Sequence, residues 1–127
     1  MKLWIDDARP APEGYVWLKS VYDAQMVIER TEYNRQWYSD RAWELYDDGH
    51  FELAERLGAG CKSSVIELID IDHDSGEFFR FGGDYIRLLD WLEETGRNYP
   101  IRIHSQNSVG VENMRRIIQR NGWKEIR

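Results

Sequence analysis

The chain has 127 residues, of which 42% are apolar, so it is long enough for one domain with a hydrophobic core and too short for two full-sized ones. Its net charge of −6 repels the phosphate backbone of nucleic acids, which argues against non-specific binding to duplex DNA. A single cysteine excludes an internal disulfide and a thiolate zinc site, and it fits a reducing cytoplasm.

Membrane attachment is not expected either. The first apolar run, residues 3–5, ends at two acidic residues and is too short for a signal peptide. No stretch approaches the roughly 20 apolar residues that a helix needs to cross a bilayer. We therefore expect one cytoplasmic domain, residues 1–127, that does not engage a membrane.

The N-terminal half begins with two predicted strands. Short apolar runs at residues 3–5 and 15–18 predict these strands, and a loop with two prolines joins them. The pattern Ser20-x-x-Asp23 has the form of a capping box and predicts that a helix starts there. Residues 31–63 continue with a helical pattern and predict a pair of helices.

The C-terminal half alternates strands with helices. Residues 65–71 are the most apolar run and predict a central strand. Further strands are predicted at residues 100–103 and 123–126, and the amphipathic segments between strands end at Gly96 and Gly122. This alternation predicts a three-layer α/β fold with a mainly parallel, five-stranded sheet.

Acidic residues follow two of these strands, where the ligand crevice of an open α/β sheet lies. Asp6 and Asp7 follow the first strand, and Asp72 follows the central one. Carboxylates brought together from adjacent strands repel one another unless a cation lies between them, and oxygen ligands suit Mg²⁺ or Mn²⁺. The sequence therefore predicts a divalent metal site at Asp6, Asp7 and Asp72. The alternative is that these acids only start loops and cap helices.

Two histidines also follow strands. His73 and Asp74 come after the central strand, and His104 comes after the next one. Histidine exchanges protons near neutral pH, so we assign His73 and His104 as catalytic base and acid. Asp74 would orient His73 or join the metal site. The alternative for each histidine is a hydrogen-bonded structural role.

Three residues predict phosphate binding. Arg9 precedes a proline that stiffens its loop, and its guanidinium can clamp a phosphate by paired hydrogen bonds. A salt bridge to Asp6 or Asp7 is the alternative. Ser105 and Asn107 lead into a helix whose first N–H groups attract anions.

Three blocks of these residues resemble a known family. The blocks are Leu3-Trp4-Ile5-Asp6-Asp7-x-Arg9-Pro10, Ile71-Asp72-His73-Asp74, and Ile103-His104-Ser105-x-Asn107-x-x-Gly110-x-x-Asn113-Met114. In this order they resemble the cyclic-phosphate processing receiver-like domain family (cREC), which is similar to the receiver domains of two-component signalling. The resemblance covers most of the chain outside residues 31–63. It implies a flavodoxin-like sheet and activity on cyclic phosphates.

The resemblance also implies roles for single residues. Asp6 and Asp7 match the metal-binding pair of a receiver, Asp72 matches its phosphoacceptor, and Ser105 matches its hydroxyl residue. The residues that distinguish the cyclic-phosphate group from ordinary receivers are His73, Asp74 and His104.

The chain departs from the receiver pattern in three places. No lysine stands at the end of the last strand, because Lys124 lies near its start. The loop between the first two strands is shorter than a parallel crossover needs, so the first receiver helix is lost or the second strand is displaced. Residues 31–63 are longer than the family leads us to expect, and we interpret them as a helical insertion.

The function expected from the sequence is that of a metal-dependent phosphoesterase. Its substrate would be a cyclic phosphate, either a 2′,3′-cyclic RNA end or a cyclic nucleotide. One alternative is a non-catalytic receiver-like regulatory or ligand-sensing domain with Asp72 as phosphoacceptor. Another is an interaction module that binds a protein partner through residues 31–63, as in a phage or defence system. We interpret the aromatic residues of that segment as helix packing rather than as a platform for a nucleobase: Trp37, Tyr38, Trp43 and Tyr46.

Overall fold

The computed structural model describes residues 1–127 and contains a five-stranded parallel sheet. The strands are β1 (Lys2–Ile5), β2 (Tyr15–Leu18), β3 (Leu68–Ile71), β4 (Ile101–Ile103) and β5 (Glu125–Ile126). Every pairing is parallel, and the order across the sheet is β2-β1-β3-β4-β5. The predicted α/β fold is confirmed, and this strand order is that of receiver- and flavodoxin-like sheets.

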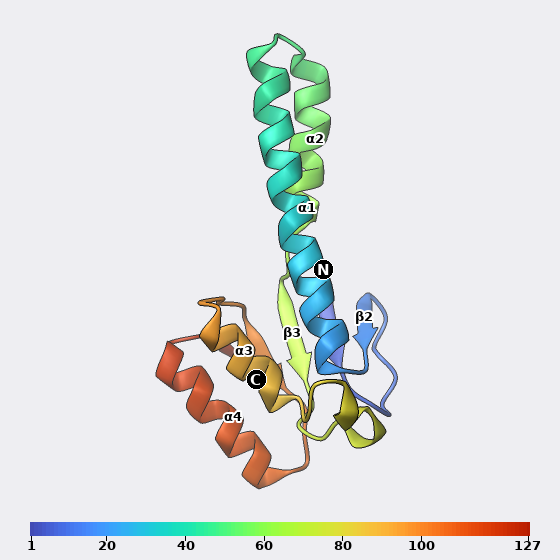
Figure 1. The fold of residues 1–127 in the computed structure, drawn as a ribbon, viewed down its shortest axis with the longest axis vertical. Coiled ribbons are helices and arrows are strands. Elements are labelled where there is room, and N and C mark those ends of the chain that lie inside the picture. The colour runs from blue at the N-terminus through green and yellow to red at the C-terminus, as the bar shows by residue number, and fades with distance from the viewer. The chain divides into compact units, whose positions relative to one another are not determined.

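Four α-helices and one 3₁₀ helix complete the fold (Figure 1). They are α1 (Val21–Asp47), α2 (Phe51–Ser63), the 3₁₀ helix η1 (Gly76–Phe81), α3 (Ile86–Glu94) and α4 (Ser108–Asn121). The chain divides into two compact units, which we call the sheet unit (Met1–Met26 with Ile66–Arg127) and the hairpin unit (Val27–Val65). None of the helices combines the length and the apolar character that crossing a bilayer requires.

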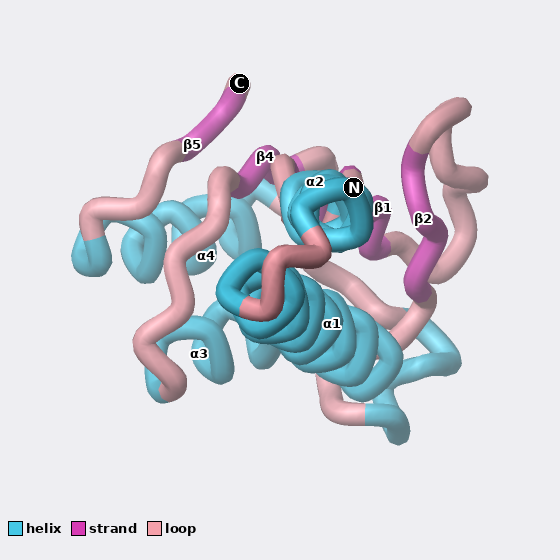
Figure 2. The backbone as a smooth tube through the Cα atoms, turned by 90° about the horizontal axis from the view of Figure 1, so that it is seen from above, coloured by secondary structure: helices cyan, strands magenta, loops and turns pink.

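One face of the sheet carries the core of the sheet unit. Side chains alternate between the two faces of a strand, and those on this face have no exposed surface: Leu3, Ile5, Ile69, Ile71 and Ile101. Helices α3 and α4 lie on the same side of the sheet (Figure 2). The buried side chains of these helices are Leu88, Leu89, Leu92, Met114, Ile117 and Ile118.

The opposite face of the central strands is polar and aromatic. Trp4 of β1, Asp70 of β3 and Arg102 of β4 are register partners, so they share this face. Arg102 is exposed, whereas Asp70 is 1% exposed. A buried carboxylate in the middle of a central strand needs a partner, and the site described below supplies one.

Two sequence expectations about the strands are refined. Strand β3 begins at Leu68, so residues 65–67 of the predicted strand lie outside it, because β1 starts at Lys2, opposite Leu68, and leaves them little to pair with. Strand β2 lies next to β1 although residues 6–14 form no helix. The second strand is therefore in place, and no helix connects it to β1.

Helix starts and stops follow the sequence signals. The hydroxyl oxygen of Ser20 accepts a hydrogen bond from the backbone N–H of Asp23 at 3.1 Å, which caps the start of α1 as predicted. Gly122 ends α4 with a φ of 66°, a left-handed conformation that glycine adopts without strain.

The hairpin unit contains two helices, but the first of them continues the helix that starts at Val21 and is not a separate helix beginning at residue 31 as predicted. Helix α1 runs without interruption from the Ser20 cap to Asp47, and the turn to α2 passes through Gly49, whose φ is 83°. Within residues 32–65 only Ala54 is buried. The two helices alone therefore form a small core.

Most of the predicted aromatic residues do not form the core of the hairpin unit. Trp37, Trp43 and Tyr46 remain 49%, 65% and 54% exposed, so these three side chains are not buried between the helices as predicted. Tyr38 does pack between the helices as predicted, because its ring lies about 3.1 Å from the position that a Cβ of residue 60 in α2 would take.

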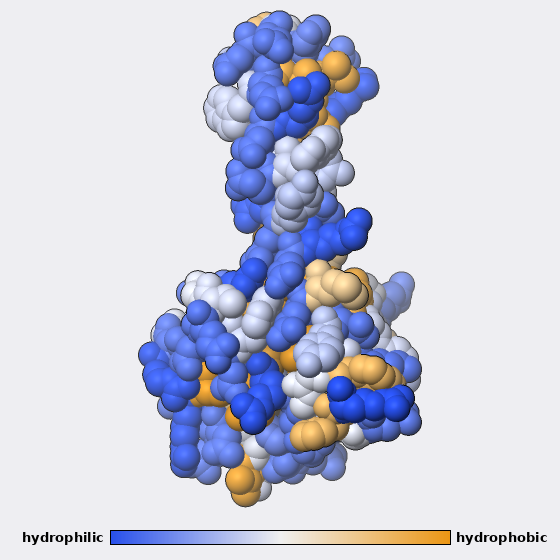
Figure 3. Space-filling view, in the orientation of Figure 1, coloured by the Kyte–Doolittle hydropathy of each residue, from blue (hydrophilic) through white to orange (hydrophobic).

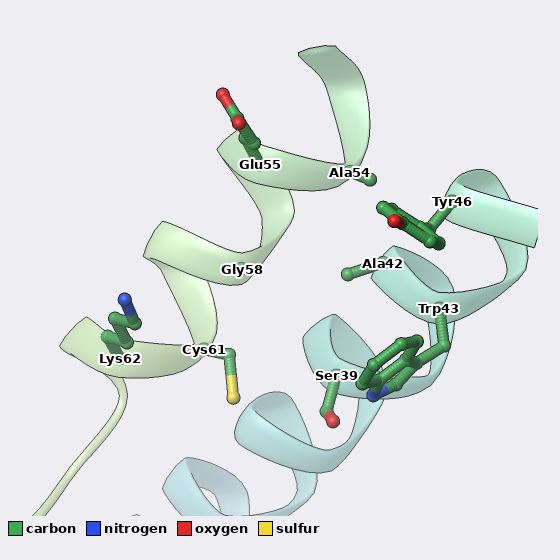
Figure 4. Close-up of a pocket in the computed structure, with 9 residues that line it drawn as sticks. All are labelled: Ser39, Ala42, Trp43, Tyr46, Ala54, Glu55, Gly58, Cys61 and Lys62. Carbon is green, nitrogen blue, oxygen red and sulfur yellow. The ribbon is translucent and has the colours of Figure 1, made fainter. Parts of the chain in front are cut away.

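A groove lies between the two helices of the hairpin unit (Figure 4). Its volume is about 490 Å³, and its lining is Ser39, Ala42, Trp43, Tyr46, Ala54, Glu55, Gly58, Cys61 and Lys62. Figure 3 shows further hydrophobic residues on the surface near the turn between α1 and α2.

Candidate functional site

The carboxyl ends of β1, β3 and β4 meet at one edge of the sheet because these strands are parallel neighbours. The structure thereby brings together the acidic and histidine residues that the sequence predicts for the site. The residues that follow the three strands are Asp6, Asp7, Asp72, His73, Asp74, His104 and Ser105. They fall into a carboxylate cluster and two histidine arrangements.

The carboxylate cluster consists of Asp6, Asp7 and Asp72. One oxygen of each lies within 4.8 Å of the others. This is an oxygen-only donor set, which is the chemistry that Mg²⁺ and Mn²⁺ prefer. The residues therefore fit a hard divalent cation.

Asp6 is the fixed member of the carboxylate cluster. Its side chain is 1% exposed, and its Oδ1 accepts the backbone N–H groups of Ala8 and Arg9 at 2.9 Å each. Its Oδ2 lies 2.9 Å from Nε2 of His104. Burial acts to raise the pKa of Asp6, but these backbone hydrogen bonds and His104 together lower it below its ordinary value. Asp6 therefore stays ionised.

The pKa of Asp7 is shifted in the opposite direction. Burial raises its pKa, and the negative charges of Asp6 and Asp72 raise it further. Its Oδ2 also packs against Gly76, where a Cβ would collide with it, and the φ of Gly76 is 55°. Glycine at this position thus lets the Asp7 carboxylate face its acidic neighbours.

Replacing Asp7 with asparagine is expected to stabilise the metal-free protein at neutral pH. Because the folded-state pKa of Asp7 is raised above 3.8, the charged form destabilises the fold at every pH above the raised value. That cost disappears as the pH falls through the raised pKa toward 3.8. Urea unfolding in EDTA should therefore show the advantage of Asp7→Asn shrinking on acidification. An advantage independent of pH would contradict this account.

His104 is held on three sides. Its Nδ1 lies 2.6 Å from Oδ1 of Asp70 and its Nε2 lies 2.9 Å from Oδ2 of Asp6. The indole of Trp4 stacks on the ring at a centroid distance of 3.7 Å and an interplanar angle of 5°. Each ring nitrogen of His104 thus has a carboxylate oxygen as its hydrogen-bond partner. Neither nitrogen is open to a substrate, so the structure favours a positioning role over the predicted acid or base role.

His73 has the free nitrogen that His104 lacks. Its Nδ1 lies 2.9 Å from Oδ1 of Asp74, and in the neutral tautomer that donates this hydrogen bond the lone pair is on Nε2. Nε2 makes no hydrogen bond, and the side chain is 14% exposed. The ring packs on Gly110 of α4, where a Cβ would lie 2.5 Å from its Cγ and Cδ2. His73 and Asp74 therefore form a pair suited to proton transfer, with the His73 ring packed against Gly110.

Arg9 is placed by its backbone and not by its charge. Its N–H donates to Asp6 and its carbonyl accepts from the indole N–H of Trp4 at 2.9 Å. Its guanidinium forms no ion pair with Asp6 or Asp7, so the predicted alternative of a salt bridge is not what the structure contains. The Arg9 side chain is exposed and free to bind an anion.

Ser105 and Asn107 build the start of α4. Asn107 caps the helix, since its Oδ1 accepts the N–H of Gly110 at 3.0 Å. The N–H of Asn107 donates to Oγ of Ser105 at 3.2 Å. These bonds leave the N–H groups of Ser108 and Val109 for an anion.

The site contains residues that the sequence interpretation missed. Asp70, Trp4 and Gly110 hold the two histidines in place. Tyr85 is fully buried and donates its hydroxyl to the carbonyl of Lys19 at 2.8 Å, and burial together with nearby carboxylates raises its pKa. For Asp70 the sequence did contain a signal, because an aspartate stands there between the apolar residues Ile69 and Ile71 of a predicted strand.

Comparisons with models of protein families, with curated proteins and with solved structures found no match to this chain.

Proposed function

We propose that the protein is a metal-dependent phosphoesterase that hydrolyses a cyclic phosphate, either a 2′,3′-cyclic RNA end or a cyclic nucleotide. One observation carries the proposal: the carboxylate cluster lies at the same sheet edge as a His73–Asp74 pair whose Nε2 has no partner. Oxygen ligands and a free imidazole nitrogen are the groups that phosphodiester hydrolysis uses.

Asp6, Asp7 and Asp72 would hold Mg²⁺ or Mn²⁺. When bound, the ion supplies positive charge that stabilises the oxygens of the reacting phosphoryl group. Asp6 is suited to this role because its carboxylate is ionised and fixed by three hydrogen bonds. Asp7 gains most from a cation, because its own charge is opposed by its neighbours.

His73 would move the proton. Nε2 takes a proton from the water whose oxygen bonds to phosphorus, and it returns that proton to the ester oxygen that leaves when the ring opens. Asp74 accepts the hydrogen bond from Nδ1 and so keeps the ring oriented and in the required tautomer. Water is added across one P–O bond, and no other reactant is needed.

Arg9 and the start of α4 would bind the non-bridging oxygens. A guanidinium donates paired hydrogen bonds to a phosphate, and the N–H groups of Ser108 and Val109 point along the helix dipole. These groups offset the repulsion that a protein of net charge −6 exerts on an anionic substrate.

The proposal is tested by a substrate panel in the presence of Mn²⁺. The panel contains 2′,3′-cyclic and 3′,5′-cyclic nucleotides and oligonucleotides with a cyclic end, with EDTA-treated protein as control. We expect hydrolysis of at least one class and its loss in EDTA. The same protein is incubated with acetyl phosphate. Acid-labile labelling that disappears in Asp72→Asn, without hydrolysis of any substrate, would favour the receiver-like regulatory domain instead.

A second candidate function is protein interaction through the hairpin unit. The observation that favours it is the exposure of Trp43 and Tyr46 beside the groove of Figure 4. If this is the function, a partner should co-purify with the protein and be lost when both rings are replaced by serine. Retention of the partner by that variant would exclude the groove as its binding site.

A further inference from the structure

Asp70 is a buried carboxylate that the proposed chemistry does not use. It lies within the central strand β3, it is 1% exposed, and it follows Ile69 and precedes Ile71, both fully buried. An ionised carboxylate in such a place is costly unless it is paired. Its partner is the imidazole of His104, 34 positions along the chain, at 2.6 Å.

The His104 ring connects Asp70 to the carboxylate cluster, because its other nitrogen lies 2.9 Å from Oδ2 of Asp6. Hydrogen bonds from its two nitrogens to Asp70 and Asp6 fix the rotation of the His104 ring, and stacking on Trp4 fixes its tilt. Oδ2 of Asp6 is therefore held by a ring that cannot turn. Oδ1 of Asp6 is held by the backbone N–H groups of Ala8 and Arg9.

We propose that Asp70 is a positioning residue that, through His104, holds Asp6 in the orientation that a divalent cation requires. This inference rests on the proposed function, because it concerns the metal site at Asp6, Asp7 and Asp72. Groups that hydrogen-bond to metal ligands fix the ligand orientation, and losing one typically weakens metal binding about 10- to 100-fold.

The experiment is calorimetric titration of the EDTA-stripped full chain with Mn²⁺. We expect Asp70→Asn to bind Mn²⁺ 10- to 100-fold more weakly than the unmodified protein, because an amide keeps the shape of the side chain and removes its charge. The matched control is Ile69→Val, at the neighbouring buried position on the opposite face of β3, and its affinity should be unchanged. If Asp70 only stabilises the fold, the Mn²⁺ affinity of both variants should fall in proportion to their loss of stability, which urea unfolding measures.

A double-mutant cycle tests whether the effect of Asp70 on Mn²⁺ affinity depends on His104. If Asp70 acts through His104, His104→Gln alone and His104→Gln with Asp70→Asn should show the same loss of affinity. Additive losses, or an unchanged affinity in Asp70→Asn, would overturn the inference. If Asp70→Asn does not fold, His104→Gln carries the test, and unchanged binding by it would overturn the inference equally.

The failure of this inference and the failure of the proposed function give different results. Normal Mn²⁺ binding by Asp70→Asn removes the positioning role and leaves the phosphoesterase. The expected loss of affinity, with no hydrolysis of any cyclic phosphate, supports the positioning role and removes the phosphoesterase. No Mn²⁺ binding by the unmodified protein overturns both.

Discussion

Replacing His73 with alanine is expected to lower the rate of cyclic phosphate hydrolysis by about 10²- to 10⁴-fold, because it removes the only imidazole nitrogen at the site without a partner. The fold should survive, since the ring lies over the start of α4 and outside the apolar core. The measurement is the Mn²⁺-dependent rate at saturating substrate, together with urea unfolding.

The matched control for this variant is His50→Ala. His50 is the remaining histidine of the chain, it is exposed in the hairpin unit, and its side chain does not cap α2. Its replacement should leave hydrolysis unchanged. Equal rates for His73→Ala and the unmodified protein would show that His73 does not move the proton in the reaction.

Replacing Gly110 with alanine is expected to reduce hydrolysis almost as much as removing His73. The new Cβ would lie 2.5 Å from Cγ and Cδ2 of the ring and 2.9 Å from Nδ1, so the ring has to leave its seat on α4. The helix itself should tolerate the change, because alanine is favoured over glycine inside a helix by about 1 kcal/mol. The assay is the same rate measurement, and the NMR signals of the His73 ring report its displacement.

Gly58→Ala is the matched control for Gly110→Ala. A Cβ at residue 58 of α2 meets no other atom within 4 Å, so this variant should gain about 1 kcal/mol of stability and lose no activity. Full activity of Gly110→Ala, with the His73 signals unchanged, would show that the ring does not pack on α4 as described.

The fold was predictable because its signals are local. The apolar runs predict β1, β2 and β4, and the Ser20 cap predicts the start of α1, each from a few neighbouring residues. The first residue of β3 was not predictable from the sequence. It depends on where β1 begins, and the two paired residues lie more than sixty positions apart in the chain. The absence of a helix between β1 and β2 was one of the two outcomes that the length of this loop allowed.

The residue types of the site were predictable, but their division of labour was not. The two histidines look equivalent in the sequence, since each follows a strand. Only the fold shows that Asp70 and Asp6 occupy both nitrogens of His104, while Asp74 occupies one nitrogen of His73. Strand alternation places Asp70 on the face opposite Ile69 and Ile71, but the sequence does not show which histidine it meets there.

The proposed phosphoesterase depends on a divalent metal site formed by the carboxylates of Asp6, Asp7 and Asp72 beside His73. The most direct measurement is a crystal structure of the protein with Mn²⁺, with the ion located by its anomalous scattering. We expect one Mn²⁺ about 2.1 Å from oxygens of these three carboxylates. His73, Asp74 and Asp84 form another set of atoms within 4.8 Å of one another. An ion bound there instead, or none at the three carboxylates, would contradict the account.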